Sequence, residues 1–188
     1  AEGTILDIMV KNTESRVRTI KLVEIKELDE QSYITYTSAW KDRDEPLCPS
    51  SCDIAELSFS EWQKRELSLQ NEATLPHGFV RAETLFLVED NGYILGAVNL
   101  RYAITEDLLR YGGHISFGIR PEERKKGYGF IIVKLALNRL RINGILKALV
   151  TVKRSNKAAK NTIKKIGGTL ENAYEENGQV IDRYWIAL

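Results

Sequence analysis

The chain has 188 residues, of which 43% are hydrophobic and 28% charged, and these values are typical of a globular protein. A chain of this length can bury a core of its own, so we expect one domain over residues 1–188. The formal net charge is only +1, which excludes an overall field that would attract nucleic acid or an anionic membrane surface.

The N-terminal region, residues 1–16, is a possible extension and lacks the basic stretch and long apolar core of a signal peptide. No apolar run in the sequence approaches the length of about 20 residues that spans a bilayer. Cys48 and Cys52, in the segment "CPSSC", have a spacing that suits a small disulfide, half a metal site or two reduced thiols. No further cysteine is present to complete a four-ligand zinc site, and we predict no metal. We favour reduced thiols in a cytoplasmic protein.

The first half of the chain predicts one strand and two helices. Residues 17–25 alternate as a strand does, and residues 28–40 suit a helix. Residues 41–58 are rich in Pro, Ser and Asp, which is typical of a loop. Ser60 is the predicted N-cap of the next helix, which residues 71–78 end.

The second half predicts a denser alternation of elements, with Asn91-Gly92 and Asn177-Gly178 as hairpin turns because both pairs accept positive φ. The expected elements are a hairpin over 84–101, a strand over 112–121, a helix over 129–143, a strand over 145–152, a helix over 156–166 and a hairpin over 169–188. Residues 113–152 form a βαβ crossover flanked by antiparallel hairpins. We therefore predict an α/β (α+β) fold, with a mixed, mostly antiparallel sheet of about six to seven strands and helices on both faces.

The segment "RPEERKKGYGF", residues 120–130, lies where the strand of this crossover ends and its helix begins. Unpaired N–H groups and the positive end of the helix dipole meet at such a place. Gly127 and Gly129 allow positive φ and a close approach of a ligand to the backbone. The pattern is neither the G-x-x-x-x-G-K-[ST] of a P-loop nor the G-x-G-x-x-G of a dinucleotide site. It is R-x-x-G-x-G, formed by Arg124, Gly127 and Gly129.

The stretch "ISFGIRPEERKKGYG" resembles the acyl-CoA-binding motif of the GNAT superfamily of acyl-CoA-dependent N-acetyltransferases. The resemblance is closest to an uncharacterised bacterial branch and covers residues 84–188, which would form the acetyl-CoA-binding half. Asn156, Ala159 and Gly167 in "NKAAKNTIKKIGG" match a further family pattern, in which a helix begins with asparagine and ends in glycine. Residues 26–80 would then shape the acceptor site.

The resemblance implies a site for acetyl-CoA where the sheet splays between its fourth and fifth strands. The backbone of Phe117, Gly118 and Ile119 would pair with the pantetheine arm, and Asn156 would bond that arm from the other side, with Lys160 nearby. A backbone N–H would stabilise the oxyanion of the acetyl carbonyl. The pyrophosphate would lie against the stretch formed by Arg124, Lys125, Lys126, Gly127, Tyr128, Gly129 and Phe130.

The catalytic groups are less clearly marked. Family members often place a tyrosine acid seven residues after the helix asparagine, where this chain has Ile163. His114, on the strand that leads into the motif, is a candidate base or proton relay, and an alternative is a buried histidine bonded to a loop carbonyl. Glu83 is a further candidate base, and Tyr174 a candidate acid.

Two basic features have competing interpretations. Arg101 suits an acidic acceptor or an acceptor carboxylate, and equally a salt bridge with Glu106 or Asp107. The lysine-rich helix over 156–166 lacks aromatic stacking groups, so we expect a solvated face rather than a nucleic-acid site.

The resemblance therefore implies an N-acetyltransferase that transfers an acetyl group to a primary amine, either a small molecule or a peptide. We expect direct attack in a ternary complex, because no cysteine lies in the motif and both cysteines are distant in sequence. The alternative is a coenzyme A-binding sensor of the same fold, which the residue Ile163 motivates. The C-terminal hairpin is a possible edge for a homodimer.

Overall fold

The computed structural model describes residues 8–11 and 17–188. The β-strands are β1 (Ile8–Lys11), β2 (Val17–Glu24), β3 (Ala82–Glu89), β4 (Ile94–Arg101), β5 (Ile115–Ile119), β6 (Lys147–Lys153), β7 (Thr169–Glu176) and β8 (Gln179–Ala187). The α-helices are α1 (Glu30–Lys41), α2 (Phe59–Ser68), α3 (Glu106–Tyr111), α4 (Tyr128–Ile142) and α5 (Lys157–Lys165). No helix in these two ranges is long and apolar enough to cross a membrane.

All the strands belong to one eight-stranded sheet with the order β1-β2-β3-β4-β5-β6-β8-β7. Among the strands of the described residues, only β5 and β6 are parallel neighbours, and the other pairs are antiparallel. The predicted fold class, a mixed sheet with helices on both faces, is thereby confirmed. The count exceeds the predicted six to seven because β1, which pairs with β2, lies in the segment that we treated as a possible extension. Strand β7 forms the other edge of the sheet. A homodimer through the C-terminal hairpin would require the hairpin to lie at an edge of this kind.

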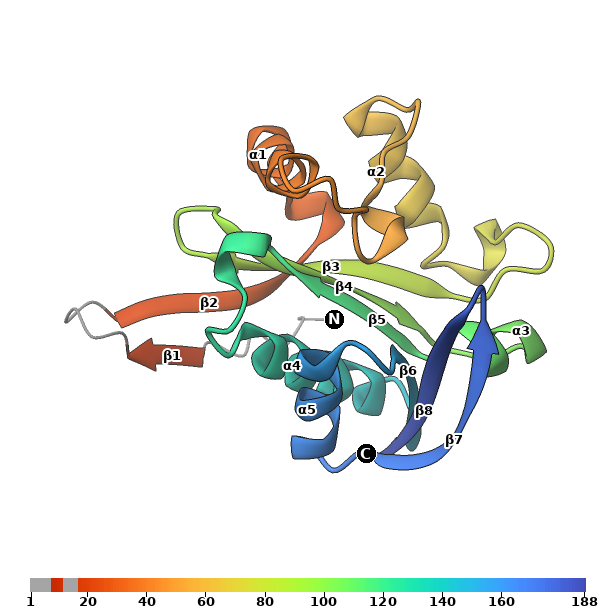
Figure 1. The fold of residues 1–188 in the computed structure, drawn as a ribbon. Helices are drawn as coiled ribbons and strands as arrows, with labels where there is room; N and C mark the ends of the chain where they lie inside the picture. The colour runs from red at the N-terminus through yellow and green to blue at the C-terminus, as the bar shows by residue number, and fades with distance from the viewer. Residues whose placement is uncertain (1–7, 12–16) are drawn as a thin grey trace.

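The helices lie in two layers, with α1 and α2 on one face of the sheet and α4 and α5 on the other (Figure 1). Strands β3 and β4 are buried on both faces, which explains their nearly continuous apolar sequence. Within β3, Leu85 and Leu87 pack in the α4 core, whereas Phe86 and Val88 pack in the core under α1 and α2. The parity of a residue along β3 therefore decides which layer its side chain enters.

Two local predictions need correction. Helix α2 begins after Ser58, not Ser60, because the Ser58 and Glu61 side chains form a reciprocal capping box. Helix α3, between β4 and β5, was not predicted. It has only six residues, too few for a helical pattern of apolar positions, and its N-cap is Thr105. The predicted helix over 129–143 is confirmed as α4 with its first residue at Tyr128, and Gly144 follows it at φ +85°.

Candidate active site

Strands β5 and β6 separate soon after they meet. Strand β5 pairs with β4 from Ile115 to Ile119, whereas its register with β6 holds the single pair Ile115 and Val150. We call the part of β5 beyond this pair, residues 116–119, the splay. Its position matches the predicted opening between the fourth and fifth strands, because β1 was not in that count.

The N-terminus of α4 follows the splay after one 3-10 turn, Pro121–Glu123. Lys125 and Gly127 both have left-handed backbones, with φ +64° and +89°. A Cβ built on Gly127 would have no atom within 4 Å, so the backbone is open there. The first N–H groups of α4 have no helical acceptor and no N-cap side chain. These features fit an anionic group such as a pyrophosphate.

The cationic side chains of the motif are less free than the sequence implied. Arg124 binds Glu45 through two hydrogen bonds of 3.0 and 2.6 Å, and its Nε donates to the Ile119 carbonyl at 3.2 Å. Lys126 pairs with Glu123 at 2.9 Å. Tyr128 is buried in the α4 core, and the Phe130 ring lies under the ammonium groups of Lys134 and Lys165. The backbone, more than these side chains, is therefore available for a phosphate.

Helix α5 supplies the second wall of the predicted cofactor site. The Asn156 side chain caps the helix by accepting the Ala159 N–H at 3.1 Å. Lys160 reaches the buried Asp182 at 3.3 Å. A Cβ built on Gly129 would lie 3.7 Å from both Thr162 of α5 and Phe117 of β5, so α4, α5 and the splay meet at this point.

Ile163, at the position where family members often carry a tyrosine, is fully buried in the α4 core. It lies directly against Gly168, where an added Cβ would be only 2.6 Å from its side chain. The Ile163 side chain is therefore a core group, and it has no titratable atom that could protonate a leaving thiolate.

The loop between α1 and α2 lies against the splay. The Cys48 thiol donates to the Phe117 carbonyl at 3.2 Å, and a Cβ on Gly118 would be 2.3 Å from the Cys48 carbonyl. Cys48 is distant from the motif in sequence, but it lies against β5 in space because the chain folds back over this strand. Both cysteines are free. Burial raises the pKa of the Cys48 thiol, which disfavours the nucleophilic thiolate.

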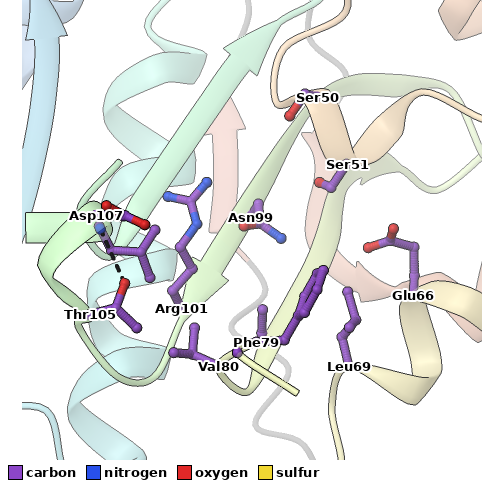
Figure 2. A pocket seen from close by; sticks show the side chains of 13 residues that line it. Ser50, Ser51, Glu66, Leu69, Phe79, Val80, Asn99, Arg101, Thr105 and Asp107 are labelled. Atoms are coloured by element: carbon purple, nitrogen blue, oxygen red, sulfur yellow. Dashed lines mark hydrogen bonds between the residues drawn. The ribbon is translucent and has the colours of Figure 1, made fainter. Parts of the chain in front are cut away.

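A pocket of about 400 Å³ lies on the α1 and α2 side of the sheet, beside the start of β5 (Figure 2). We call it the acceptor pocket, after the role that we propose for it below. Asn99 and Arg101 of β4 line it, and Asn99 is opposite Ser116 of the splay in the β4–β5 register. Its remaining lining residues are Ser50, Ser51, Glu66, Leu69, Gly78, Phe79, Val80, Ala82, Thr105, Asp107 and Leu108.

Glu66, which the sequence analysis did not select, is the buried carboxylate of this pocket and is 3% exposed. Its Oε1 accepts hydrogen bonds from the Arg65 side chain at 3.1 and 3.0 Å. Its Oε2 accepts from the Thr84 hydroxyl at 3.2 Å. Burial raises the pKa of the Glu66 carboxyl, opposed by the Arg65 and Thr84 hydrogen bonds. Helical spacing alone did not separate Glu66 from the solvated Glu61, the other glutamate of α2.

His114 has a structural contact that limits its chemistry. Its Nδ1 accepts the Leu149 N–H at 2.9 Å, so the imidazole bridges β5 and β6 where they part. Burial and the nearby Arg101 charge lower the pKa of His114, which keeps the ring neutral. A neutral ring with an occupied Nδ1 carries its proton on Nε2 and has no free lone pair. This geometry favours a structural role for His114 as a buried, hydrogen-bonded histidine over a role as base or proton relay.

Glu83 and Tyr174 lie away from the acceptor pocket. Glu83 points to the α4 face, where it binds Arg139 and accepts a hydrogen bond from Tyr102. Its position in β3 has the opposite parity to Thr84, whose hydroxyl bonds the pocket residues Glu66 and Asn99. Tyr174 of β7 packs edge-on against Tyr111 of α3, with its hydroxyl buried and without a partner in the described residues. Neither contact supports the predicted base and acid.

Solved structures of acetyltransferases share this fold. The ribosomal-protein-S5-alanine acetyltransferase of Vibrio fischeri has a TM-score of 0.65 at 13% identity, over 96% of this chain and 97% of that one. The spermidine/spermine N-acetyltransferase SpeG of Vibrio cholerae, in mutant forms, has a TM-score of 0.60 at 16% identity, over 89% and 93%. An acetyltransferase of the GNAT family from Streptococcus pneumoniae has a TM-score of 0.59 at 17% identity, over 90% and 99%.

No curated protein matches the chain in sequence. The model of the acetyltransferase (GNAT) family matches residues 48–167, more than half of the chain. The matched segment contains the α1–α2 loop from Cys48 onward, the splay, the α4 N-terminus and all of α5. Together with the fold, this match confirms the predicted resemblance and the predicted enzyme class. The chain therefore belongs to the acetyltransferase (GNAT) family.

Proposed function

We propose that this protein is an acetyl-CoA-dependent N-acetyltransferase whose acceptor is a primary amine bound in the acceptor pocket. The observation that carries the proposal is the junction of the splay with the open, left-handed N-terminus of α4. On one side of this junction the backbone suits an extended acyl-CoA arm and its phosphates. On the other side, the acceptor pocket adjoins the same strand through the pairing of Asn99 with Ser116.

Acetyl-CoA supplies an acetyl group as an activated thioester. The N–H groups at the start of α4, around Gly127 and Gly129, would hold the pyrophosphate by backbone hydrogen bonds. The splay, including Phe117 and Ile119, would border the pantetheine arm. In the structure the carbonyls of these two residues accept hydrogen bonds from Cys48 and Arg124, so pairing with the arm requires an exchange of those bonds.

An amine acceptor is protonated near neutral pH and must lose a proton before it can react. We propose Glu66 as the group that receives this proton. Its carboxylate lines the acceptor pocket, and burial raises its pKa toward the range in which a carboxylate is an effective base. The raised pKa of Cys48 supports direct attack by the amine rather than an acyl-enzyme.

The test is acetyl-CoA binding by calorimetry, followed by detection of free thiol during incubation with a panel of amines and peptides. Saturation with acetyl-CoA at about 100 times its dissociation constant is expected to stabilise the protein by about 2.7 kcal/mol. Binding with amine-dependent thiol release supports the proposal. A lack of binding at millimolar acetyl-CoA would refute it, and binding without release to any acceptor would favour the sensor, for which the burial of Ile163 is the supporting observation.

A further inference from the structure

We propose that the acceptor pocket selects amines that also carry a carboxylate, as α-amino acids with apolar side chains do, and that Arg101 pairs with this carboxylate. The inference rests on the proposed acetyl transfer and narrows its acceptor to one chemical class.

Arg101 is a largely buried cation without an anionic partner. Its Nη1 donates to the carbonyls of Gly112 and Gly113 at 3.0 and 3.2 Å. Across residues 17–188, no carboxylate forms a salt bridge with it, and its Nε and Nη2 have no hydrogen-bond acceptor. Arg120 and Arg139, by contrast, each have a glutamate partner. Burial lowers the pKa of Arg101, which is the expected cost of an uncompensated charge.

The two predicted partners of Arg101 do not bind it. Helix α3 carries Glu106 and Asp107 in its first turn, and neither forms a salt bridge with any described residue. The other carboxylate of the pocket, Glu66, is already paired with Arg65 at 3.0 Å. In Figure 2 the Arg101 guanidinium and Glu66 stand on opposite walls of the pocket. Among the described residues, the Arg101 guanidinium therefore has no ion pair at the β4 wall, although Asp107 also lines the pocket, and a carboxylate of the acceptor would supply one.

Asn99 provides a second polar contact in line with Arg101. Its Nδ2 donates to the Glu83 carbonyl at 3.3 Å and to the Thr84 hydroxyl at 3.1 Å. These bonds orient the amide so that Oδ1 remains as an acceptor for the ammonium or amine of a ligand. Asn99 and Arg101 are two residues apart and share one face of β4, and Asn99 lies opposite Ser116 of the splay. An acceptor bound along this row would place its amine toward the splay and its carboxylate at Arg101.

The rest of the pocket is suited to an apolar side chain. Leu69, Phe79, Val80 and Leu108 line it, and the Phe79 side chain is 60% exposed although it is aromatic. A volume of about 400 Å³ lies within the usual range for small-molecule sites. A carboxylate, an amine and one apolar group, as in leucine, methionine or phenylalanine, match these three features.

The experiment compares three matched acceptors: L-phenylalanine, L-phenylalaninamide and phenethylamine, with the leucine and methionine series as repeats. Turnover is followed by thiol release, and binding is measured by calorimetry in the presence of coenzyme A. The wild-type protein is expected to favour the free amino acid over its amide and over the plain amine by about tenfold to a hundredfold in kcat/KM and in affinity. The amide has the less basic amino group, which favours its reaction and makes the comparison stringent.

The variants are Arg101→Gln, which removes the charge, and Arg101→Lys, which keeps it. In Arg101→Gln the ratio of kcat/KM for the free amino acid to kcat/KM for its amide is expected to fall toward one, while acetyl-CoA affinity stays unchanged. Arg101→Lys is expected to retain part of the preference for the free amino acid. Equal use of the three acceptors by the wild-type protein, or no binding of any free amino acid, would overturn the inference even if Arg101→Gln fails to fold. Acetyl-CoA affinity is measured separately. A protein that does not bind acetyl-CoA would count against the proposed function. A protein that binds acetyl-CoA but does not distinguish acceptors with a carboxylate from those without would count against this inference alone.

Discussion

Replacement of Gly127 by alanine tests the cofactor site, because Gly144 provides a matched control at the other end of the same helix. Both glycines have left-handed backbones, with φ +89° and +85°, and an added Cβ meets nothing within 4 Å at either. Alanine in this conformation costs about 1–2 kcal/mol, so both variants should lose similar stability, about 2–4 °C in Tm for each kcal/mol. The two positions are separated by about 25 Å along the axis of α4.

The two variants should differ in cofactor binding. At Gly127 the methyl group would project from the backbone that we expect to hold the pyrophosphate, so at least one charge-assisted hydrogen bond should be lost. Such a bond contributes about 1.5–3 kcal/mol, which corresponds to about a tenfold to hundredfold loss of acetyl-CoA affinity. Gly144→Ala should bind acetyl-CoA as the wild-type protein does. Calorimetric titration measures the acetyl-CoA affinity of both variants. Equal acetyl-CoA affinity in the two would refute the proposed location of the phosphate site.

Three further outcomes are expected. His114→Asn should keep both stability and turnover, because an amide oxygen can still accept the Leu149 N–H, whereas His114→Ala should lose about 1–3 kcal/mol in denaturant unfolding; lost turnover in a stable His114→Asn protein would show that the ring is catalytic. Glu66→Gln should lower kcat by about a hundredfold or more and remove the acid limb of the pH profile of kcat. In the wild-type protein this acid limb should lie above pH 4.5, because burial raises the pKa of the Glu66 carboxyl above its usual value of 4.5. The folded pKa exceeds the unfolded one, so the wild-type protein should gain stability relative to Glu66→Gln as the pH falls through that window, and parallel pH dependences of Tm would contradict this. Cys48→Ser should retain turnover under direct attack, and its loss together with a trapped acyl group on the wild-type cysteine by mass spectrometry would instead indicate an acyl-enzyme.

The sequence by itself determined the parts of the protein that depend on local chemistry. Turn glycines, a proline at the end of β5 and the apolar face of α4 act over a few residues, so the βαβ unit and the R-x-x-G-x-G turn could be located. The left-handed backbone at Gly127 agrees with this prediction, and so does the position of the splay. Short elements with weak patterns, β1 and α3, were missed because four and six residues carry too little periodicity.

The tertiary structure alone decided which side chains share a site. Glu83 and Thr84 are neighbours in a strand that is buried on both faces, so the apolar pattern could not show that Thr84, and not Glu83, lies on the side of Glu66 and the acceptor pocket. Arg124 and Glu45 are 79 residues apart, and Cys48 meets Phe117 across 69 residues, because a long loop closes over β5. The unmatched charge of Arg101 likewise depends on where α3 places its acidic residues. Local propensity determines the elements, whereas register and loop closure determine the environment of each charge, and that environment sets the chemistry of the site.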